Sequence, residues 1–158
     1  MIARCIVEIG TSSYYSALRD AVEEPVLKEI CRNIAADEIR HYKLFSRQLT
    51  RCLERERIGL WRRLRIALGR IAESEDDELA YAYYAANETA LPYDRRRCSR
   101  AYARRALTIV HAHHVERGVA MIFKSVGLTP NTRLAHAAAR LAGASLRRRA
   151  ARLAKIAA

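Results

Sequence analysis

The chain contains 158 residues, of which 51% are hydrophobic, so it is long and apolar enough for one folded domain and is not wholly disordered. Its 29 Lys and Arg residues outweigh 17 Asp and Glu residues and give a formal charge of +12, which suits a polyanionic partner or reflects a coding bias toward Arg. No run approaches the roughly 20 apolar residues of a membrane span, and the first residues lack the apolar region of a signal peptide. We therefore expect no transmembrane segment and a cytoplasmic location.

The helix signals predict an all-α protein. Only 6 Gly and 3 Pro residues interrupt the chain, and no segment of useful length alternates with the period of two that a half-buried strand requires. In chain order we expect one domain with a helix hairpin over 1–55, a crossover helix over 56–72, a second helix hairpin over 73–127 and a basic C-terminal helix over 128–158.

The first hairpin is expected to contain helices over about residues 2–21 and 25–55, since Pro25 suits the first turn of a helix. In the second hairpin, Ser74 is expected to cap one helix, and a single uninterrupted helix is expected over about residues 95–126. Leucines recur among alanines in the C-terminal helix, at Leu134, Leu141, Leu146 and Leu153. We expect this helix to dock on the bundle or on a second subunit.

Glu38 and His41 form the most informative pair in the sequence. Their three-residue spacing puts both side chains on one face of the second helix. The same stripe carries apolar residues, at Leu27, Ile30, Ile34, Phe45, Leu49 and Cys52. We therefore expect the pair to point toward a core, where an unpaired carboxylate is costly and a bound cation makes it tolerable. Glu8, on an inward stripe of the preceding helix, is expected to join them.

The run from Glu8 to Tyr15 and the motif Glu38-Ile-Arg-His41 resemble the rubrerythrin-type branch of the ferritin-like superfamily, over roughly residues 1–50. The resemblance implies a ferritin-like up-down four-helix bundle, in which Glu8, Glu38 and His41 are half of a dinuclear carboxylate centre. It further implies two iron ions, oxidoreductase chemistry that activates dioxygen or peroxide, and a position for Tyr15 within reach of the metals. The alternative for Tyr15 is a core aromatic without a redox role.

The resemblance also implies that the second hairpin supplies another Glu and another Glu-x-x-His motif. Asp77 and Glu78 both suit the first role by their positions before a Tyr pair, and the helix stripe favours Glu78. No Glu-x-x-His motif follows, and the sequence offers His111-x-x-His114 and His113-x-x-Glu116 instead. We expect His111 and His114 as ligands, with Glu116 as a further candidate, whereas the alternative is that these histidines only make hydrogen bonds in the core. A centre richer in nitrogen could hold iron in an altered geometry, manganese, zinc or no metal.

The four cysteines are scattered without a Cys-x-x-Cys motif, so neither a rubredoxin-like iron centre nor a zinc ribbon is expected in this chain. An oxidoreductase of this kind would need a separate electron donor protein, and we expect a homodimer. Iron storage is an alternative function that the strongly basic charge disfavours. A metal-free bundle that binds nucleic acid or an anionic membrane surface is another, through Arg-rich segments at 62–65, 95–97 and 147–149.

Overall fold

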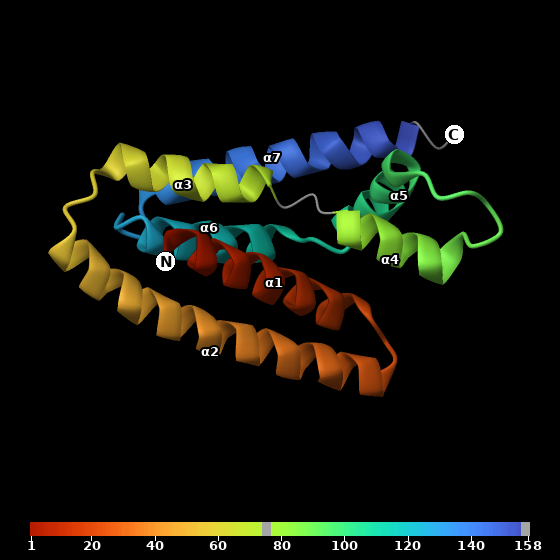
Figure 1. Ribbon diagram of the computed structural model, residues 1–158, viewed down its shortest axis with the longest axis horizontal. Helices are drawn as coiled ribbons and strands as arrows, with labels where there is room; N and C mark the ends of the chain where they lie inside the picture. The colour runs from red at the N-terminus through yellow and green to blue at the C-terminus, as the bar shows by residue number, and fades with distance from the viewer. Residues whose placement is uncertain (74–76, 156–158) are drawn as a thin grey trace.

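The computed structural model describes residues 1–73 and 77–155, and within these ranges the chain is all-helical with no strand, which confirms the predicted all-α class. The helices are, in chain order (Figure 1), α1 (Ile2–Ala21), α2 (Pro25–Arg55), α3 (Leu60–Ala72), α4 (Asp77–Asn87), α5 (Arg95–Thr108), α6 (Ala112–Ser125) and α7 (Arg133–Lys155). None of them has the length and apolarity that crossing a membrane demands. The cap predicted at Ser74 lies outside the described ranges.

The helices α1 and α2 form a long hairpin with the bounds that the sequence predicts. The carboxylate of Glu24 accepts hydrogen bonds from the backbone N–H groups of Val26 (3.0 Å) and Leu27 (2.5 Å), and Pro25 occupies the first turn, where no backbone donor is needed. The buried residues of α2 recur at intervals of four and seven, at Cys31, Ala35, Tyr42 and Leu49. This stripe packs against α1 and holds the hairpin together.

The helix α1 lies at the centre of the molecule, where it packs against α2, α3 and α6. In Figure 1, α2 runs along one side of α1 and α3 along the other. The main core is shared by these helices and the residue that follows α6, and consists of Ile2, Cys5, Ile6, Ile9, Tyr42, Leu49, Ala67 and Val126. The hydroxyl of Tyr42 donates a hydrogen bond of 3.3 Å to the carbonyl of Met121, which ties α2 to α6.

The single helix predicted over about residues 95–126 is wrong, because the chain breaks between Thr108 and Ala112 into α5 and α6. Three successive β-branched residues, Thr108, Ile109 and Val110, disfavour a continuous helix at this point. His111 then takes the cap position of α6. The break leaves α4 and α5 packed mainly on each other and on α7, at one end of the molecule (Figure 1).

The C-terminal helix α7 docks on α5 and α6 of its own chain, in agreement with the predicted packing on the bundle. Small residues make this contact, since Ala135, Ala139 and Gly143 are buried at intervals of four residues. Leu134 and Leu141 point away from it and are exposed. A stripe of small side chains lets two helices approach closely, so the alanines, and not these two leucines, form the docking face.

Candidate metal centre

Glu8 from α1 meets Glu38 and His41 from α2 at the middle of the first hairpin. The Nδ1 atom of His41 lies 3.4 Å from Oε2 of Glu38 and 3.8 Å from Oε2 of Glu8. One potential ligand atom from each of the three side chains lies within 4.8 Å of the others. The proximity expected from the sequence is therefore present, and we refer to these three residues as the carboxylate–histidine triad.

The triad opens to solvent on one side. The side chain of Glu8 is only 8% exposed, whereas that of Glu38 is 20% exposed and that of His41 is 57% exposed. The expectation that Glu38 and His41 both point into a core is therefore wrong for His41. The physical reason is that α1 covers one face of α2, but the second hairpin does not pack along the other face.

The two carboxylates of the triad influence each other strongly. Burial, together with the hydrogen bond and the negative charge of Glu38, raises the pKa of Glu8 to about 7. The hydrogen bond from Glu8 lowers the pKa of Glu38, against the opposing effect of burial. Near neutral pH the pair therefore shares one proton, with His41 and Arg4 as nearby groups that favour the ionised forms. A cation in place of that proton lets both carboxylates ionise, so the donor set fits a metal ion.

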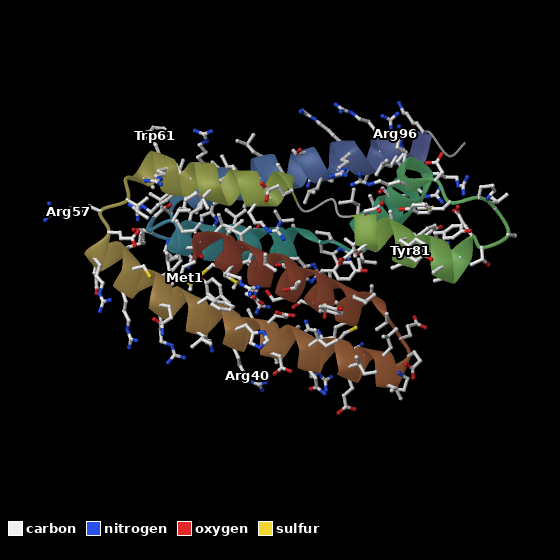
Figure 2. All side chains as sticks on the ribbon, in the orientation of Figure 1. Met1, Arg40, Arg57, Trp61, Tyr81 and Arg96 are labelled. Atoms are coloured by element: carbon white, nitrogen blue, oxygen red, sulfur yellow. The ribbon has the colours of Figure 1, made fainter. Side chains whose placement is uncertain are left out.

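Arg4 and Tyr15 on α1 pack against aromatic rings, whereas Arg40 on α2 does not face α1. The guanidinium of Arg4 lies over the ring of Phe45, 5.5 Å from its centroid. Tyr15 packs edge-on against Tyr14, with 5.6 Å between the ring centroids, which suits the alternative of a packing aromatic. Arg40 projects from the side of α2 that faces away from α1 (Figure 2).

The residues predicted from the second half do not join the triad. Glu78 is exposed at the start of α4, His111 caps α6, and Glu116 is exposed on α6. His114 is buried, but it lies beside Asp20 at the far end of α1. The break between α5 and α6 puts His111, His114 and Glu116 together at the start of α6, and the contact of His114 with Asp20 places this end of α6 beside the last turn of α1, away from Glu8.

Asp20, His113 and His114 form a second cluster, in which one potential ligand atom from each residue also lies within 4.8 Å of the others. The Nε2 atom of His114 lies 3.0 Å from Oδ2 of Asp20, and that of His113 lies 3.6 Å from the same oxygen. The backbone N–H of His111 donates a hydrogen bond of 3.1 Å to Nδ1 of His114. Because Nδ1 accepts this bond, the neutral ring carries its proton on Nε2 and donates it to Asp20.

This hydrogen-bond pattern favours a structural role for the second cluster. A histidine that binds a metal through one ring nitrogen normally donates a hydrogen bond from the other, and Nδ1 of His114 accepts one instead. Burial acts to raise the pKa of Asp20, but hydrogen bonds from His114 and Arg19 outweigh it and hold the pKa at about 2. The cluster thus caps α6 and fastens it to the last turn of α1.

Asp20 is the member of this cluster that the sequence interpretation missed. An acidic residue in the last turn of a helix opposes the helix dipole, and its presence there indicates a specific partner. The sequence alone does not identify this partner, because the histidines lie more than 90 positions further along the chain.

Comparison of the chain with protein-family models, with curated proteins and with solved structures finds no match. The molecule is thus defined by its fold and its site, as an all-helical protein with a carboxylate–histidine triad between its first two helices. The functional argument rests on the chemistry of those side chains.

Proposed function

We propose that this protein is a ferritin-like metal-carboxylate protein, which holds iron through Glu8, Glu38 and His41 and acts as an oxidoreductase. The observation that carries the proposal is the meeting of a buried carboxylate from α1 with the Glu-x-x-His motif of α2, with potential ligand atoms within 4.8 Å of one another. One such Glu and one such motif are the recurring donors of the carboxylate centres in ferritin-like bundles.

The donor types are compatible with iron but do not select it over other metals. Two carboxylate oxygens and one imidazole nitrogen suit iron, with manganese and zinc as competitors for the same atoms. Iron bound to this set would supply the activation of dioxygen or peroxide.

Glu8, Glu38 and His41 would have different roles in binding the metal. Glu8 provides a buried anchor on the rigid central helix, while Glu38 and His41 provide donors at the solvent side, where an ion and a small oxidant can enter. A separate protein would supply electrons, because the four cysteines do not form a Cys-x-x-Cys centre.

Metal analysis of the purified full-length chain tests the proposal. After removal of adventitious metal and anaerobic loading with Fe(II), the wild type should retain iron through gel filtration. Glu38→Ala should weaken the affinity at least about tenfold, since even outer ligand contacts contribute that much. Glu29→Ala removes an equal charge from an exposed position of the same helix and is the matched control.

The two variants also define the outcome that contradicts the proposal. If the wild type retains no iron, or if Glu38→Ala and Glu29→Ala lose it equally, the triad is not an iron site. Dioxygen and peroxide consumption by the loaded wild type then separates an oxidoreductase from a storage protein. A storage protein would instead accumulate many iron ions per chain.

A further inference from the structure

The α1–α2 hairpin provides half of a dinuclear ligand set. It supplies one Glu, at position 8, and one Glu-x-x-His motif, from Glu38 to His41. A complete carboxylate centre of this type uses two of each, projecting from four helices. Within the described residues, no other carboxylate or imidazole joins the triad. The described part of this chain thus supplies half of such a set.

The helix α2 carries an unpaired stripe beside its buried one. This stripe, here called the open face, has the spacings of three and four residues that are typical of helix pairing, and consists of Leu27, Ile30, Ile34, Glu38 and His41. Leu27 is 40% exposed and Ile30 is 48% exposed, although both are large apolar side chains. The open face thus combines three apolar residues with two candidate ligands, and among the described residues no helix other than α1 makes an extensive contact with α2.

We propose that a second copy of this chain packs against the open face and completes a dinuclear metal centre, an inference that rests on the proposed function. The two α2 helices cross as antiparallel partners about a two-fold axis. Each copy contributes Glu8, Glu38 and His41. The pair together offers two Glu residues and two Glu-x-x-His motifs, which is the full set.

The position of the triad on α2 supports a symmetric partner over an unrelated one. The midpoint of α2, which spans Pro25–Arg55, falls at Arg40, directly between Glu38 and His41. A two-fold axis through this midpoint therefore superposes α2 along its whole length on its copy and places the two triads together. In an isologous contact each patch faces its own copy, so the open face needs no other complementary surface.

The charges along α2 agree with an antiparallel arrangement. The C-terminal half of the helix is strongly basic, with Arg40, Lys43, Arg47, Arg51 and Arg55 against Glu54. The N-terminal half is mixed, with Lys28 and Arg32 against Glu29, Asp37 and Glu38. Antiparallel pairing sets the basic half of one copy beside the mixed half of the other, whereas parallel pairing sets the two basic halves together.

The mass and the metal spectrum of the full chain test the inference together. Loaded with Mn(II), the wild type should elute at twice its chain mass of 18.0 kDa and bind one ion per chain. Two ions in one centre lie about 3.5–4 Å apart, so the electron paramagnetic resonance spectrum should show a spin-coupled pair.

Variants of the open face locate the contact. Ile30→Arg places a charge on the open face at a side chain that is already half exposed, so the monomer should keep its helical content but lose the dimer and the spin-coupled signal. Leu27→Arg is a second variant of the same kind. Leu141→Arg, at an exposed leucine of α7 outside the open face, is the control and should keep both.

The outcomes separate this inference from the proposed function. A monomer that binds one uncoupled Mn(II) ion, abolished by Glu38→Ala, overturns the shared centre and leaves the metal function intact. A dimer that binds no metal overturns both. A dimer whose mass and coupled spectrum survive both Ile30→Arg and Leu27→Arg overturns the assignment to the open face.

Discussion

Asp20 and His114 lie 94 positions apart in the sequence, yet Nε2 of His114 donates a hydrogen bond of 3.0 Å to Oδ2 of Asp20. The contact joins the last turn of α1 to the first turn of α6. Because Nδ1 of the same ring accepts the backbone N–H of His111, His114 uses both nitrogens inside the fold. This gives His114 a structural role in place of the metal-ligand role predicted from the sequence.

Replacement of His114 should destabilise the protein. His114→Ala removes the buried hydrogen-bond partner of Asp20 and leaves the His111 N–H without its acceptor, and we expect a loss of about 1–3 kcal/mol in the free energy of unfolding. Urea denaturation followed by circular dichroism measures it. His136→Ala, at an exposed position of α7, should stay within about 0.5 kcal/mol of the wild type. Equal effects at the two positions would contradict the structural role.

The Asp20 carboxylate should also give stability that depends on acid pH. Its pKa is lowered from 3.8 to about 2 in the folded protein, so the unfolded chain takes up the proton first as the pH falls. The stabilisation is complete above about pH 3.8 and disappears as the pH approaches 2. The stability difference between the wild type and Asp20→Asn should therefore shrink as the pH falls from about 3.8 toward 2. A difference that grows on acidification would refute this assignment.

Glu8 should have the opposite effect on the metal-free protein. Its pKa is raised from 4.5 to about 7 by burial and by Glu38, so the unfolded chain loses the proton first as the pH rises. This group therefore costs the folded state stability progressively between about pH 4.5 and 7. Without metal, Glu8→Gln should melt at a higher temperature than the wild type at pH 8 and at a similar temperature at pH 4.5. With Fe(II) present the order at pH 8 should reverse, because only the wild type gains stability from bound metal.

The docking face of α7 can be tested by enlarging a buried side chain and, in a second variant, shortening an exposed one nearby. Ala139 is buried against the bundle, so Ala139→Leu should overpack the contact and cost about 1–3 kcal/mol. Leu141 is 74% exposed, so Leu141→Ala should change the free energy of unfolding by less than about 0.5 kcal/mol. Thermal unfolding of the two variants measures both effects, and the reverse ranking would show that the leucines make the contact.

The first hairpin could be predicted from the sequence because its determinants are local. Pro25 marks the start of α2, and the apolar stripes of α1 and α2 fix which faces meet. The spacing of Glu38 and His41 likewise puts both on one side of a helix. The exposure of His41 was not predictable in this way, since it depends on whether another element covers that side of α2.

The helices and contacts of the second half were harder to predict, because they depend on competition between local and distant interactions. The break after Thr108 follows from three β-branched residues in a row, a signal that was present in the sequence and was outweighed by the helical pattern around it. The contact of His114 with Asp20 involves segments that only the tertiary fold brings together. No spacing rule within one helix predicts such a pair.

The small second core of α4 and α5 has a consequence for local unfolding. Among the described residues its buried members are Ala80, Tyr83 and Cys98, and it lies apart from the larger core around α1. Segments with few buried apolar contacts open at a lower free energy than the rest of a protein. We expect the backbone amides of α4 and α5 to exchange with deuterium well before those of α1 and α2. The α1–α2 hairpin would then stay closed while the far end of the molecule opens and refolds.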